Sequence, residues 1–101
     1  MYLIQILLPL ADNEGRPYPD NLLQSSQMEL SRYFGGLTAY SRAPAKGVWN
    51  RSGGQQEDDI VVVEVMAQTL DEGWWREFRR RLEKVLRQER VVIRAQEMRT
   101  L

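Results

Sequence analysis

The chain has 101 residues, a length that suits one domain with one hydrophobic core. It is 43% hydrophobic and 28% charged, as folded globular proteins are, and its 14 basic and 14 acidic residues leave no net charge to attract nucleic acid or anionic lipid. Cysteine and histidine are both absent, which excludes disulfides, thiolate or imidazole catalysis, and metal sites built on those ligands. We therefore expect a single domain over residues 1–101 that uses no cofactor.

The first half of the chain predicts a strand followed by a helix. Residues 2–8 are apolar in both parities apart from Gln5, which indicates a central strand, and the run ends too early for a signal peptide or a membrane span. We therefore expect a cytoplasmic protein. Residues 11–19 predict a loop. A helix is expected over residues 20–34, capped by Asp20 or Asn21 and ended by Gly35 in a left-handed conformation.

The second half predicts two more strands, a helix and a last strand. Residues 37–42 and 59–67 have strand composition, and residues 43–56 between them form either a long hairpin with an extended tip or a partly mobile loop. Thr69 and Glu72 have the spacing of a capping box that opens a helix ending near residue 88. The core stripe of this helix is expected to be Trp75, Phe78, Leu82, Val85 and Leu86. Residues 90–98 predict a strand at the edge of the sheet.

This element order predicts an α+β domain of the ferredoxin-like β-α-β-β-α-β type. In that fold a four-stranded antiparallel sheet, in strand order 4-1-3-2, carries both helices on one face. Strand parity predicts that the other, open face holds Leu3, Gln5, Leu7, Ile60, Val62, Glu64, Met66, Val92, Arg94 and Gln96. So much aliphatic surface favours a homodimer formed through the open sheet face, and a small-molecule pocket between the two sheets is the alternative.

Charged and amide groups on that face form the candidate site. A carboxylate among aliphatic side chains is costly to bury alone. Glu64 and Arg94 therefore form either an ion pair between subunits or a pocket in which Glu64 is a base and Arg94 holds an anionic ligand. Residues 42–56 add groups for anion binding and stacking, although a purely structural hairpin also explains them. The candidate ligand-binding set is Gln5, Glu64, Arg94, Gln96, Arg42 and Trp49.

Nucleic acid and membranes are not expected as partners. The strand at residues 59–67 carries aliphatic side chains where an RNA-recognition domain has stacking aromatic residues. The basic residues of the second helix alternate with acidic ones, as with Glu77 and Arg81 or Glu83 and Arg87, a spacing typical of a solvated helix face.

Three stretches carry a resemblance to a known family: the Phe-Gly-Gly-Leu-Thr-Ala-Tyr run at residues 34–40, Gly47-Val48-Trp49, and the strand at residues 59–65. Together they resemble a family of short uncharacterised bacterial proteins. The resemblance implies a ferredoxin-like fold and an oligomer, and it assigns no catalytic residue. More distantly, the layout is similar to the dimeric α/β-barrel proteins, which include cofactor-free monooxygenases and isomerases. Two functions stay open: a non-catalytic interaction or ligand-sensing domain, and a cofactor-independent enzyme with its pocket on the open sheet face.

Overall fold

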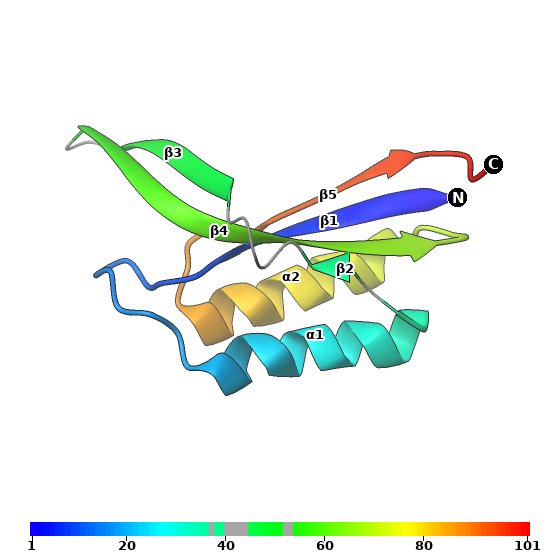
Figure 1. Ribbon diagram of the computed structural model, residues 1–101, viewed down its shortest axis with the longest axis horizontal. Helices are drawn as coiled ribbons and strands as arrows, with labels where there is room; N and C mark the ends of the chain where they lie inside the picture. Colours follow the sequence, from blue (N-terminus) through cyan, green and yellow to red (C-terminus); the bar gives the residue numbers. More distant parts are fainter. Residues whose placement is uncertain (37, 40–44, 52–53) are drawn as a thin grey trace.

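The computed structural model describes the backbone of residues 1–36, 38–39, 45–51 and 54–101, and the side chains of residues 1–36 and 60–101. The elements are β1 (Tyr2–Pro9), α1 (Asp20–Phe34), β2 (Thr38–Ala39), β3 (Ala45–Arg51), β4 (Gly54–Ala67), α2 (Glu72–Leu86) and β5 (Val92–Glu97). Both helices cover the same face of the sheet (Figure 1), which confirms the expected α+β class and its two layers. No helix in the described part of the chain is long and apolar enough to cross a membrane.

The sheet is antiparallel throughout its described pairings. Its strand order is β2-β4-β1-β5, with β3 also paired to β4, so the order expected for the fold is present and β5 lies at an edge as predicted. The expected number of strands is wrong, because the described residues form a five-stranded sheet. The additional strand arises where residues 45–51 pair with residues 54–60, which makes this segment a hairpin that projects beyond the end of β1 (Figure 1).

The hydrophobic core lies between the sheet and the helices. Alternate residues of β1 and β4 point toward the helices, and this parity agrees with the prediction. The core consists of Ile4, Ile6, Leu8, Leu30, Val61, Val63, Val65, Trp75, Phe78, Leu82, Leu86 and Val91. The sequence assigned Val85 to the same stripe, but its side chain is 53% exposed. The core stripe of α2 advances by three or four residues at each step, and residue 85 falls beside that line.

The ends of the helices agree only in part with the sequence prediction. Gly35 ends α1 with φ 78°, a left-handed conformation, and its amide donates to the Ser31 carbonyl at 2.9 Å, as expected. The N-cap residue of α1 is Pro19, which makes no side-chain capping bond, so the predicted cap at Asp20 or Asn21 is wrong. Proline already has the backbone φ that a helix start requires, and the helix begins directly after it.

The predicted capping box of α2 is also wrong. Asp71, and not Thr69, is the N-cap, since its Oδ1 accepts a hydrogen bond from the Trp74 amide at 3.1 Å. Glu72 is the first helical residue and pairs with Arg76 at 3.2 Å instead of reaching back. A carboxylate at the N-cap both satisfies a free amide and complements the helix dipole, so it prevails over a threonine two residues earlier.

Replacing Trp75 by alanine should lower the free energy of unfolding by about 3–5 kcal/mol. The ring is 6% exposed and stacks on Phe34 of α1 at a centroid distance of 5.1 Å, so its loss opens a cavity between both helices and the sheet. Val85→Ala is the matched control and should change stability by less than about 0.5 kcal/mol. Urea denaturation of both variants measures the difference; equal effects would contradict the assignment of the core.

Replacing Asp71 by alanine should lower the free energy of unfolding by about 0.5–2 kcal/mol, because the Trp74 amide loses its acceptor. Thr69→Ala removes a side chain that makes no capping bond and should have little effect. Thermal denaturation followed by circular dichroism compares the two variants. A larger loss of stability for Thr69→Ala would support the capping box that the sequence predicted.

Candidate functional site

A row of three polar side chains crosses the open face of the sheet. Gln5 of β1 lies opposite Glu64 of β4 on one side and opposite Arg94 of β5 on the other. The Gln5 Nε2 donates to Glu64 Oε2 at 2.7 Å, and the Arg94 Nε donates to Gln5 Oε1 at 2.7 Å. One amide therefore uses its donor and its acceptor to connect a carboxylate to a guanidinium. We call this arrangement the Glu64–Gln5–Arg94 row.

The row is surrounded by apolar side chains on the same face. Two residues away along the strands lie Leu3, Leu7, Val62, Met66 and Val92, all aliphatic or thioether in character. Most of them are half-buried, and Met66 is 57% exposed. Hydrogen bonds to charged groups are stronger where nearby apolar groups exclude water. The row thus places a carboxylate, an amide and a guanidinium across two strand intervals of a largely apolar face, with Gln96 as a further polar neighbour.

Sequence reasoning placed these three residues on one face, and the expected strand order 4-1-3-2 put the first strand between Glu64 and Arg94. The structure shows this order and how the first strand bridges the gap. Gln5 stands between them at the same level of the sheet because both registers meet at this residue. A glutamine side chain is the right choice for this position because its amide can donate at one atom and accept at the other.

The other predicted site residues are not part of the row. Gln96 lies opposite Leu3, one step further along the same face, and in the described part of the chain it makes no hydrogen bond to the row. Trp49 lies in β3, where its backbone is opposite Gln56. Its side chain, like the whole of Arg42, falls outside the described residues. Ile60, expected to be exposed on the open face, is 7% exposed at the point where β1 and β3 both pair with β4.

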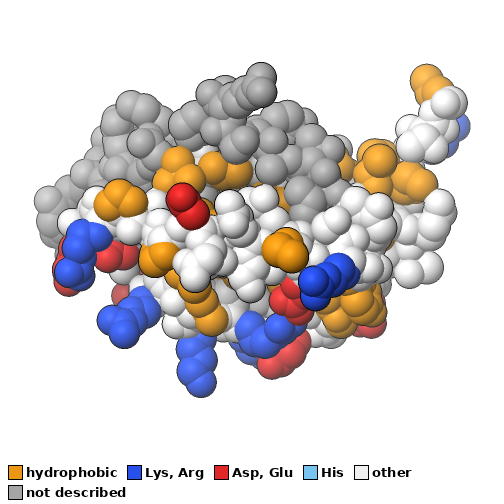
Figure 2. Space-filling model, turned by 60° about the horizontal axis from the view of Figure 1, so that its bottom comes forward, with side chains coloured by type: hydrophobic (Ala, Val, Ile, Leu, Met, Phe, Trp, Pro, Cys, Tyr) orange, Lys and Arg blue, Asp and Glu red, His pale blue; other side chains and the backbone are white. Residues whose placement is uncertain are grey.

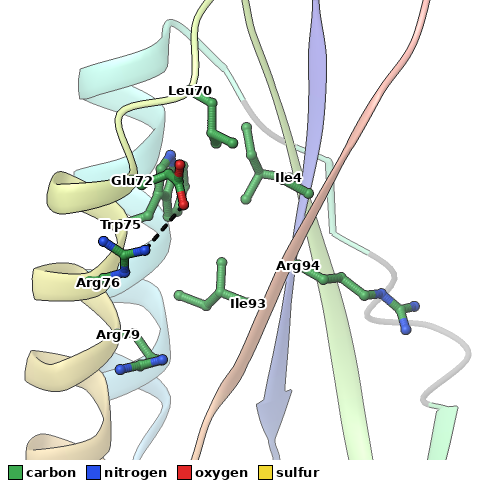
Figure 3. Close-up of a pocket in the computed structure, with 9 residues that line it drawn as sticks. Ile4, Leu70, Glu72, Trp75, Arg76, Arg79, Ile93 and Arg94 are labelled. Atoms are coloured by element: carbon green, nitrogen blue, oxygen red, sulfur yellow. Dashed lines mark hydrogen bonds and ion pairs between the residues drawn. The ribbon is translucent and has the colours of Figure 1, made fainter.

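A groove that sequence reasoning missed lies on the other face, between α2 and the edge strand β5. Its volume is about 330 Å³, and Ile4, Trp75, Arg76, Arg79 and Ile93 are among the residues that line it (Figure 3). The signal in the sequence was the small side chain of Ala95 at a helix-facing position of an edge strand, opposite two arginines one turn apart on α2. A small residue there leaves space that a larger one would fill.

The many arginines of α2 are balanced by acidic neighbours. Arg80 pairs with Glu77 at 3.4 Å, and Arg81 pairs with Glu29 of α1 at 2.9 Å, while Arg76 is already paired within the helix. Figure 2, turned toward the helical side, shows basic and acidic side chains interspersed over this surface. Arg81 reaches across to α1 where the sequence predicted a partner four residues away. The mixture of charge supports the interpretation of a solvated face.

Two shifted pKa values lie outside the row. The Glu97 carboxylate beside the Tyr2 hydroxyl, which donates to it at 3.3 Å, raises the pKa of Tyr2. In the loop after β1, backbone hydrogen bonds, first from the Arg16 amide, hold the pKa of Asp12 below its usual value. Among the described residues no group of three acidic side chains is placed to hold a metal ion.

No protein-family model and no curated protein matches the chain, so the resemblance to short bacterial proteins stays a prediction. Solved structures do match. A phage SAM lyase in complex with S-methyl-5'-thioadenosine has a TM-score of 0.69 and 17% identity over 95% of this chain and 80% of that one. CutA from Pyrococcus horikoshii has a TM-score of 0.61 and 13% identity over 100% of this chain and 87% of that one. At these identities the likeness shows the fold alone: the chain has the small ferredoxin-like α+β fold that these proteins share.

Proposed function

We propose that this protein is a homodimeric small-ligand-binding domain whose site lies on the open sheet face. The observation that carries the proposal is the Glu64–Gln5–Arg94 row, a hydrogen-bonded chain of opposite charges in an aliphatic surface. The aliphatic part of the face supplies the driving force for association, and the row supplies the polar contacts that orient a partner or a ligand. These two features are sufficient for a binding role without catalysis.

The apolar surface supports association between copies. Exposed aliphatic surface costs about 25 cal/mol per Å² relative to burial, and a contiguous patch of it is typical of an interface. Two sheets that pack face to face lie about 10 Å apart, with their inward side chains filling the space between. The aliphatic side chains beside the row, such as Leu3, Leu7 and Val62, are large enough to fill the space between two such sheets.

The charges of the row support a particular symmetry. The negative end lies on β4 and the positive end on β5, one strand to either side of β1. A two-fold axis parallel to β1, midway between two facing sheets, places Glu64 of each copy opposite Arg94 of the other. An axis perpendicular to the strands would instead place like charges together. The row therefore favours a dimer whose strands are aligned, with two identical charge pairs across the interface.

The same geometry defines the class of ligand. A small molecule held between the sheets would put a cationic centre against Glu64 and an anionic group against Arg94. S-adenosylmethionine has both, a sulfonium and a carboxylate, and S-methyl-5'-thioadenosine, the ligand bound to the phage SAM lyase, lacks both charges. This pair of compounds is the natural first test. Turnover of the charged compound would support the alternative, a cofactor-independent enzyme in which Glu64 acts directly on the substrate.

Replacing Glu64 by glutamine should weaken binding of S-adenosylmethionine at least tenfold, since the sulfonium loses its opposite charge. It should also weaken the dimer, because each Glu64 faces Arg94 of the other copy, so the affinities are compared at protein concentrations where both proteins are dimeric. Binding of S-methyl-5'-thioadenosine should change by less than threefold. Isothermal titration calorimetry measures both affinities, light scattering gives the oligomeric state, and Glu97→Gln on β5 is the control. A pure monomer at micromolar concentration would overturn the dimer, and equal losses for both compounds would overturn the role of Glu64.

Charge exchange tests the symmetry of the dimer. Glu64→Arg puts two cations opposite each other and Arg94→Glu puts two carboxylates opposite each other, so each should raise the dimer dissociation constant at least tenfold, about 1.4 kcal/mol. The double variant should return to within about threefold of the wild type, because Gln5 can turn its amide over and serve the exchanged charges. Analytical ultracentrifugation measures the constants. Additive losses in the double variant would contradict the proposed axis.

A further inference from the structure

The groove between α2 and β5 has the construction of a second binding site. It lies on the helix side of the sheet, away from the open face, and its volume of about 330 Å³ is at the lower end for small-molecule sites. In Figure 3, Ile4 and Ile93 point from the sheet into the gap toward α2. Arg76 and Arg79 line the opposite wall, and the Arg94 side chain turns away to the other side of β5. The groove therefore has an apolar floor and a charged wall, which holds Glu72 beside the two arginines.

Arg79 carries an unmet hydrogen-bond donor. Its Nε is buried and donates to no acceptor among the described residues. The ion pair of this nitrogen with Glu83 Oε2 is long, at 3.8 Å, and that oxygen already accepts from the Val91 amide at 2.9 Å. Because the Nε has almost no exposed surface, a ligand would meet the two Nη groups of Arg79 instead. These make no hydrogen bond or ion pair in the described part of the chain, and Arg79 lines the groove.

Arg76 can contribute to the same site. Its Nη2 is paired with Glu72 at 3.2 Å, and its other N–H groups make no hydrogen bond in the described part of the chain. Glu72 and Glu83 balance the charge of the two guanidinium groups, so the capacity for an anion lies in the N–H groups that these pairs leave unused. Guanidinium groups recognise carboxylates through paired, parallel hydrogen bonds. A phosphate monoester carries nearly twice the charge of a carboxylate and would also be repelled by Glu72.

We propose that this groove binds a monocarboxylate with an apolar body. The carboxylate is held by Arg79 and Arg76, and the apolar body lies on Ile4, Ile93 and the edge of Trp75. This site is independent of the proposed function, since it uses the helix side of the sheet and the row uses the open face.

Octanoate is the probe, with octanol as its uncharged match and octyl phosphate as the competing anion. Each compound is titrated into the full-length protein, and its binding is followed by two-dimensional NMR of the protein signals. Octanoate should bind saturably and shift the signals of Ile4, Ile93 and the Trp75 indole, and octanol should bind at least tenfold more weakly. Equal affinity for octanol, tighter binding of octyl phosphate, or shifts confined to the open face would each overturn the proposal.

The variants isolate the charge contribution. Arg79→Gln and, independently, Arg76→Gln should each weaken octanoate binding about tenfold while octanol binding stays unchanged. Arg80→Gln is the matched control on the same helix, because Arg80 pairs with Glu77 and does not line the groove. Should Arg79→Gln fail to fold, Arg76→Gln and the comparison of octanoate with octanol still decide the outcome. Wild-type affinity in both groove variants would show that no anion site exists.

Discussion

The pairing of β1 with a neighbour on each side is the constraint on which the rest of the structure depends. Because side chains alternate along a strand, the register that buries Ile4 and Ile6 against the helices also turns Gln5 to the opposite face. The same register sets the residues that stand beside Gln5 on β4 and β5. A shift of one residue in either pairing would expose the core and break the polar row together. Stability and the candidate site thus rest on the same hydrogen-bond ladder.

The sheet separates two surfaces with different chemistry. The open face offers charge of both signs in a flat aliphatic setting, which suits contact with another flat surface or with a ligand enclosed by one. The groove on the helix side is concave and is lined by two arginines with unused N–H groups, which suits a small anion from solution. Each surface involves β5, whose alternate residues contribute Arg94 to one and Ile93 to the other. The edge strand β5 therefore contributes to both surfaces, with different side chains on each.

Much of the fold could be predicted from the sequence, because periodicity is a direct record of which side of an element is buried. The helix-facing parity of β1 and the edge position of β5 follow from it, and Gly35 marks the end of α1. Local capping could not be predicted as well, since Thr69 and Asp71 are both competent caps and only the position of the helix start distinguishes them. The hairpin of β3 and β4 was one of two alternatives, because its glycines suit a mobile loop as well as a turn.

The residues of the candidate site could be predicted from the sequence, but the hydrogen bonds that connect them could not. Parity places Gln5, Glu64 and Arg94 on one face. Their hydrogen bonds, however, depend on which residues lie directly opposite each other in neighbouring strands. That register joins strands some sixty and ninety positions apart, and no local sequence pattern predicts it. The groove was unpredictable for a different reason. The groove exists because the small side chain of Ala95 leaves space beside α2, and no residue type in the sequence identifies such a space.

The long-range pairing of β1 also has a consequence for how the protein comes to be folded. Tyr2 pairs with Glu97, and the other neighbour of β1, the strand β4, follows α1, β2 and β3 in the chain. During synthesis the most apolar strand emerges early and has no partner until most of the domain has followed it. Such non-local pairing slows folding, and an unpaired apolar strand is prone to aggregate while it waits. The element that fixes the register of the sheet is thus the last to find both of its partners.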